Sequence, residues 1–203
     1  MYLKNQKDTI DILSKSIKIY DKNLKNKKIL FILESAKNKI ESEEVFFGKR
    51  NFYHLTGIKA TQKNGKELSA NNFYDLLLKN RLNPNNITKK NNTTDLKLQV
   101  LQQLMYIDRA ANMIGEYDED KIILKTEKIA GNVKACMGFI KDKKMNIYIP
   151  NTALKEDIRQ ITTERNKIVA ILKKDLKDEL YKSITFIKKN YENYRYIKKQ
   201  QNK

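Results

Sequence analysis

The stretch ILFILESAKNKIESEEVFF, residues 29–47, decides the predicted fold. Ile29–Leu33 is a short apolar run of β-forming residues, Ala36–Asn38 has the composition of a turn, and Ile40–Phe47 follows it. Two such runs on either side of a turn predict an antiparallel hairpin.

A second hairpin is predicted further along the chain. Its strands are Lys134–Ile140 and Asn146–Ile149, and Lys141–Lys144 supplies the turn. The β-branched runs Lys167–Lys173 and Tyr181–Ile187 favour two more strands.

Amphipathic spacing predicts helices in three places. These are Asp8–Leu24, a segment after the N-cap candidate Ser69, and a long helix from Thr94 or Asp95 to near Gly115. For Asp157–Asp178 a helix remains an alternative to a strand, because its apolar residues also fit a helical period.

Helices grouped in mid-chain with strands around them favour an α+β fold over alternating βαβ units. We therefore predict a single domain with an antiparallel β-sheet, an N-terminal helix and two mid-chain helices. The expected organisation is an N-terminal helical segment (1–28), the α+β domain (29–187) and a basic tail rich in Tyr and Lys (188–203).

Composition excludes several kinds of chemistry. A single cysteine, Cys136, cannot form an internal disulfide or a cysteine-rich zinc site, and it is expected in the core. A single histidine, His54, excludes a site built from two histidines of one chain. No apolar stretch approaches the length of a membrane span, and the N-terminus does not resemble a signal peptide, so the predicted location is the cytoplasm. No metal or cofactor is expected.

The charge indicates a polyanionic partner. The chain has 42 basic residues, most of them lysine, and 24 acidic residues, which gives a net charge of +18. Lys- and Asn-rich composition is also typical of AT-rich coding sequence, so part of this charge is compositional background. Nucleic acid remains the expected partner, as RNA or a ribonucleoprotein.

The segment FFGKRNFYHLTGI, residues 46–58, contains the histidine. We place His54 between a strand and a loop, next to Phe52 and Tyr53. A lone histidine beside aromatic residues can be a packing residue. It can equally be a general acid or base, with an ordinary pKa of about 6.5 that nearby cations such as Arg50 would lower.

The string NFYHLTGI resembles the phage-borne nuclease-like domains of the barnase–EndoU–colicin–RelE superfamily. The resemblance covers about Ile29 to Lys188. Other stretches that contribute to it are Asn72–Tyr74, Met137–Phe139, Asn146–Leu154, Asp157–Ile158 and Ile168–Lys174, with Tyr181 and Ile184.

This resemblance implies metal-independent cleavage of RNA on a small α+β scaffold, in a mobile element or a toxin system. The ribose 2′-hydroxyl would be the nucleophile, leaving a cyclic phosphate and a 5′-hydroxyl. His54 would be one proton-transfer group, and the candidates for the second are Tyr148 and Lys173. For substrate binding the candidates are Arg50, Thr56, Asn151 and Thr152.

Several alternatives stay open. Tyr148 can be a packing residue, Lys173 is one lysine among many, and Thr152 can cap a helix containing Leu154 and Ile158. The tail can stack on bases or be a frayed helix. The alternative function is a non-catalytic protein that binds RNA or a ribonucleoprotein, for example a phage-encoded inhibitor of an RNA-guided defence nuclease. A protein antitoxin or target is a further possible partner, and a structural phage component is a weaker third interpretation.

Overall fold

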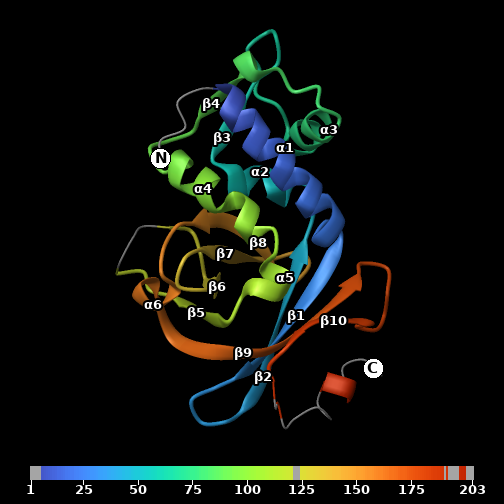
Figure 1. The fold of residues 1–203 in the computed structure, drawn as a ribbon, viewed down its shortest axis with the longest axis vertical. Helices are drawn as coiled ribbons and strands as arrows, with labels where there is room; N and C mark the ends of the chain where they lie inside the picture. Colours follow the sequence, from blue (N-terminus) through green and yellow to red (C-terminus); the bar gives the residue numbers. More distant parts are fainter. Residues whose placement is uncertain (1–5, 121–123, 190, 192–196, 200–203) are drawn as a thin grey trace.

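The strands close into a barrel (Figure 1). The computed structural model describes residues 6–120, 124–189, 191 and 197–199. Within these residues, seven strands form a closed mixed β-barrel. Around the barrel the order is β1 (Lys27–Glu34), β2 (Ile40–Phe47), β8 (Ile147–Leu154), β7 (Cys136–Asp142), β6 (Lys128–Gly131), β5 (Met113–Tyr117) and β9 (Thr162–Asp175).

The predicted antiparallel sheet with one N-terminal and two mid-chain helices is therefore wrong. β9 pairs with β1 and closes the barrel, and β10 (Ser183–Ile187) adds to β9. The sheet is mixed because β2 runs parallel to β8, with Val45 opposite Tyr148. Both predicted hairpins are confirmed, as β1–β2 and β7–β8. Hairpins are local patterns, whereas neither the β2–β8 contact nor the β9–β1 contact has a local signature.

The apolar run in β1 is buried on both faces of the strand. Ile29, Phe31 and Leu33 belong to the main core, while Leu30 and Ile32 pack in a second cluster. This alternation follows from the two-residue period of a strand. The second cluster also contains Val169, Ala170, Leu172, Tyr181 and Ile197.

Helices cover one end of the barrel (Figure 1). They are α1 (Gln6–Asn23), α2 (Asn51–Thr56), α3 (Ala70–Leu78) and α4 (Thr94–Leu104), with the 3₁₀ turn η1 (Pro84–Asn86). A small sheet of β3 (Ile58–Ala60) and β4 (Ile87–Lys89) lies among them, with Ile58 opposite Lys89. Because β3 follows α2 and β4 precedes α4, this pairing brings the histidine-bearing helix beside the start of α4.

The helix predicted from Thr94 to near Gly115 is too long. It ends at Leu104, the short α5 (Ile107–Ala110) follows, and Met113–Tyr117 is strand β5. Gly115 is required for packing in the barrel, since a Cβ there would lie 2.7 Å from the Thr163 carbonyl oxygen. The alternative helix over Asp157–Asp178 is limited to the single turn α6 (Ile158–Ile161), after which β9 begins.

Much of the predicted basic tail lies outside the described residues. In the described part, Ile197 is fully buried in the second cluster, and Tyr191 packs against that cluster. Among the helices of the described residues, none is long and apolar enough to cross a membrane.

Candidate active site

The histidine lies on α2 rather than between a strand and a loop. Asn51, the first residue of this helix, accepts a hydrogen bond from the Gly48 amide at 2.7 Å and donates one to the Pro150 carbonyl at 3.3 Å. The helix ends at Gly57, which adopts the left-handed conformation with φ of 67°. Glycine accepts this conformation without steric penalty. Helix α2 is thus fixed at both ends and anchored to β8.

A cavity of about 290 Å³ opens between α2, the start of α4 and β8. Its lining combines polar, cationic and apolar groups, which suits a ligand with both charged and apolar parts. The lining residues are Tyr53, His54, Gly57, Ile58, Glu67, Lys90, Asn91, Lys97, Leu124, Thr126, Asn151 and Thr152.

His54 is exposed on the cavity, and its surroundings disfavour its charged form. The surrounding protein removes solvent from the imidazole, and the Lys90 ammonium and Arg50 guanidinium repel a second positive charge. Together these effects lower the pKa of His54 below 6.5. These effects favour the neutral ring, which is the form that can accept a proton.

Lys97 is the site residue that the sequence analysis missed. Its Nζ donates a hydrogen bond to Thr152 Oγ1 at 2.9 Å, which links α4 to β8. Burial and the nearby Lys90 ammonium lower the pKa of Lys97. One signal was present in the sequence: Lys97 lies four residues before Leu101 on the apolar face of the helix, where a lysine is unusual.

Two of the predicted binding residues, Asn151 and Thr152, line the cavity beside His54. Thr152 belongs to β8 and is no helix cap; Asp157 caps α6 instead, accepting from the Arg159 amide. Arg50 forms an ion pair with Asp142 at 3.2 Å and influences His54 through its charge.

Thr56 is fully buried beside this site. Its hydroxyl donates to the Tyr53 carbonyl at 2.8 Å and accepts from the Ile58 amide at 3.1 Å. The first bond lies within α2 and the second ties the end of α2 to the start of β3, so the structure places this hydroxyl in the scaffold of the cavity.

Tyr148 and Lys173 do not join the cavity. Tyr148 lies between Lys128 and Lys141, whose ammonium groups are 5.5 and 5.9 Å from its ring centroid. Lys173 donates to the carboxylate of the fully buried Asp108 at 2.6 Å and to the Asn23 carbonyl at 3.2 Å.

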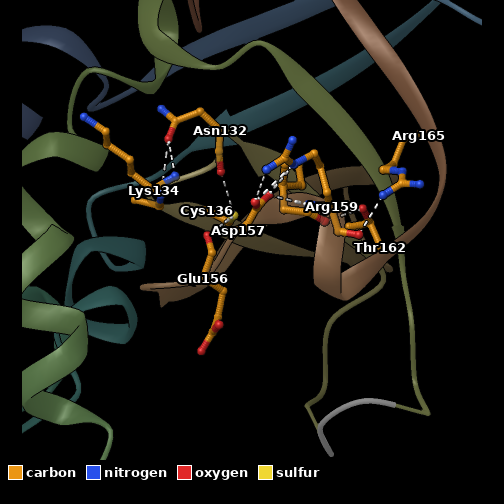
Figure 2. A network of polar contacts seen from close by, with 10 residues as sticks. Asn132, Lys134, Cys136, Glu156, Asp157, Arg159, Thr162 and Arg165 are labelled. Atoms are coloured by element: carbon orange, nitrogen blue, oxygen red, sulfur yellow. Dashed lines mark hydrogen bonds and ion pairs between the residues drawn. The ribbon is translucent and has the colours of Figure 1, made fainter.

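Cys136 lies in another part of the barrel, near α6 (Figure 2). Its Sγ donates to the Glu156 carbonyl at 3.1 Å, and burial raises the pKa of the thiol to about 12. A thiol with this pKa is protonated at neutral pH and is a poor nucleophile. In the described part of the chain, no group of three or more His, Cys, Asp or Glu side chains has an arrangement that could hold a metal ion.

A cavity with one neutral imidazole and two lysines offers chemistry suited to a phosphodiester. The chain matches the family model PBECR4, described as phage-Barnase-EndoU-ColicinE5/D-RelE like nuclease4, over residues 12–190. It therefore belongs to this family of phage nuclease-like proteins, which confirms the resemblance carried by NFYHLTGI. Neither a curated protein nor a solved structure matches the chain.

Proposed function

We propose that this nuclease-type protein is an endoribonuclease and that the cavity between α2, α4 and β8 is its active site. The observation that carries the proposal is the position of His54, an imidazole with a lowered pKa, on the same cavity as Lys90 and Lys97. RNA supplies its own nucleophile in the 2′-hydroxyl. Such a site then has to supply a base, an acid and stabilisation of negative charge.

In the proposed reaction, neutral His54 removes the proton from the 2′-hydroxyl. The 2′-oxygen attacks the adjacent phosphorus, and the bond from phosphorus to the 5′-oxygen of the next nucleotide breaks. The products are a 2′,3′-cyclic phosphate and a 5′-hydroxyl, and no metal ion takes part. The lowered pKa of His54 supports this assignment, because it favours the neutral ring, which can accept a proton.

Lys97 is the proposed general acid, in place of a tyrosine or of Lys173. Its lowered pKa makes its ammonium a better proton donor than an ordinary lysine. The bond to Thr152 Oγ1 orients the ammonium within the cavity. Lys90 offsets negative charge on the phosphate, and Asn151 contributes polar groups at the β8 side of the cavity.

The decisive test measures cleavage of labelled single-stranded RNA in EDTA by the purified chain and by His54→Ala. Loss of a general base lowers the rate by about 10²- to 10⁴-fold. The wild-type rate should decrease as the pH is lowered through a value below 6.5, because protonation removes the base. His54→Gln is a milder second variant if the alanine variant folds poorly.

Full cleavage by His54→Ala would contradict the proposal, and a rate that falls only as the pH rises through this range would make His54 the acid. The net charge of +18 favours the alternative, a non-catalytic RNA- or ribonucleoprotein-binding protein, independently of the cavity. Salt-sensitive RNA binding by a wild-type chain that cleaves no RNA would select that function. The origin of the family in phage is consistent with a toxin or mobile-element effector acting on RNA.

A further inference from the structure

In the part of the chain that the structure describes, one buried hydroxyl at the cavity has no hydrogen-bond partner. Thr126 lines the cavity and is 5% exposed, and among the described residues its Oγ1 has no partner. Buried hydroxyl groups almost always form a hydrogen bond, and leaving one unpaired is unfavourable. The neighbouring polar groups are engaged: Thr152 Oγ1 accepts from Lys97, and the Asn151 amide nitrogen donates to the Lys125 carbonyl.

The absence of a side chain at Gly138 leaves room for the side chains of Thr126 and Thr152 at the cavity wall. Gly138 lies behind both threonines, and a Cβ at this position would be 2.8 Å from the Cγ2 atoms of Thr126 and Thr152. Threonine populates more than one χ1 rotamer, so a rotation can exchange its methyl and hydroxyl groups at the cavity wall. The contact with a ligand needs such a rotation, because the hydroxyl oxygen is buried as it stands and lies, with the methyl group, against Gly138.

The size and the lining of the cavity define the ligand. A volume of about 290 Å³ is near the lower end of small-molecule sites and is suited to about one nucleotide unit. Ile58, Leu124 and Tyr53 offer apolar contact area, and Lys97 and Lys90 offer positive charge. Proteins commonly bind single-stranded RNA in this way, with an unstacked base in an apolar site and hydrogen bonds to its edge.

We propose that the cavity holds one unstacked nucleotide of single-stranded RNA, with the Thr126 hydroxyl bonding the edge of the base and Lys97 contacting the adjoining phosphate. This inference rests on the proposed function, because it names the substrate form that the same site accepts. It makes Thr126 a residue that determines specificity: the enzyme binds and cleaves unpaired RNA and discriminates between bases at one position.

The test compares Thr126→Val with Thr126→Ser and with Thr162→Val as a matched control. Valine keeps the shape of threonine and removes the unpaired hydroxyl, so Thr126→Val should unfold at the same temperature or a higher one. Thr162 is also buried but donates to the Ile158 carbonyl, so Thr162→Val should lose stability and leave RNA binding unchanged.

Binding is measured by fluorescence anisotropy in the His54→Ala background, with labelled homopolymers of A, C and U and with a duplex of matched length. Thr126→Val should bind at least one single-stranded homopolymer about 2- to 10-fold more weakly, as expected for one lost hydrogen bond, and the duplex with unchanged affinity. Thr126→Ser keeps the hydroxyl and should bind like the parent.

Equal affinity of Thr126→Val and its parent for all the single strands would overturn the inference, as would cleavage of duplex at the single-strand rate by the wild type. These results would leave the nuclease proposal intact if His54→Ala still silences cleavage. Weaker single-strand binding by Thr126→Val in a chain without cleavage would support the nucleotide site and reject the nuclease proposal.

Discussion

Lys90 influences two ionisable side chains of the cavity at once. Its charge contributes to the lowered pKa of His54 and to the lowered pKa of Lys97, in both cases after the larger effect of burial. Both shifts favour the neutral form of the side chain. A negative charge that enters the cavity would raise both pKa values again. If the cavity binds RNA as proposed, the phosphate charge will stabilise the protonated forms of both groups and so raise both pKa values on binding.

The role of Lys97 can be separated from general charge by comparing Lys97→Met with Lys155→Met. Both variants lose one positive charge, but Lys155 is exposed and donates a hydrogen bond to the Gln99 side chain at 2.7 Å, away from the cavity. Lys97→Met should cleave RNA about 10²- to 10⁴-fold more slowly, a typical loss for one general acid. Its thermal stability should be unchanged or higher, because a lysine with a lowered pKa is charged at a cost in the fold.

Lys155→Met should retain cleavage within a few-fold. An equal loss of rate in the two lysine variants would contradict a specific role for Lys97. It would mean that Lys97 contributes only as one of many positive charges. Cleavage rates and thermal unfolding are measured on the same preparations, so that a folding defect is not mistaken for lost chemistry.

Some of the individual residues that line the cavity could be predicted from the sequence. His54 could be predicted because it is the single histidine, and Asn151 and Thr152 because the resemblance pointed to them. The position of Lys97 on the apolar face of its helix was a weak signal, and it gained a meaning only with the contact between α4 and β8. Thr126 has no sequence signal, since an unpaired hydroxyl is a property of packing alone.

Helix α5 and strand β9 are joined through a buried charge. The Asp108 carboxylate is fully buried between Lys173, at 2.6 Å, and Arg109, at 3.1 Å. Lys173 also bonds the Asn23 carbonyl, so it connects the end of α1, the short α5 and the long β9. The position that the resemblance offered as catalytic is thus held in a scaffold contact.

We expect Lys173→Met to lower the free energy of unfolding by about 3–5 kcal/mol, toward the smaller value because Arg109 still pairs with Asp108. The measurement is urea unfolding, with cleavage normalised to folded protein as the second readout. The double variant Asp108→Asn, Lys173→Met should recover part of the loss, because no unpaired buried charge remains. If Lys173→Met were stable but did not cleave RNA, the result would contradict the structural role and support Lys173 as a catalytic residue.

Elements were predictable from the sequence where their signals are local. The hairpin of β1 and β2 and that of β7 and β8 each contain two apolar runs and a turn within a short stretch. The boundary between α5 and β5 was missed because Ile114 continues the apolar spacing of the preceding helices, and only pairing with β6 and β9 makes this segment a strand. Tertiary pairing overrides helical periodicity there.

For the whole molecule, the charge of +18 predicts strongly salt-dependent RNA binding. Single-stranded RNA that contacts about three to five phosphates should give a slope of about −2 to −3.5 in a plot of log affinity against log salt. Affinity should then fall roughly 10- to 100-fold between 50 and 200 mM salt. Filter binding with the His54→Ala variant measures this slope, and an affinity independent of salt would contradict a phosphate-based interface.

Barrel closure was the part of the architecture least accessible to prediction. Lys27 on β1 pairs with Asp175 on β9 across a sequence separation of 148 residues, and no composition or period marks that contact. The family resemblance supplied a nuclease scaffold but not the way in which its sheet closes.

The same closure has a consequence for synthesis of the protein on the ribosome. β1 is made early and lies between β2 and β9, but β9 emerges only after every other barrel strand has been translated. Contacts between distant parts of a chain slow folding, because the loop must close before the pairing stabilises it. β8, which carries Asn151 and Thr152, is held on one side by a single parallel register pair to β2 and on the other by β7. The β8 wall of the cavity therefore gains its final support late, and the nascent chain passes most of its translation without the assembled cavity.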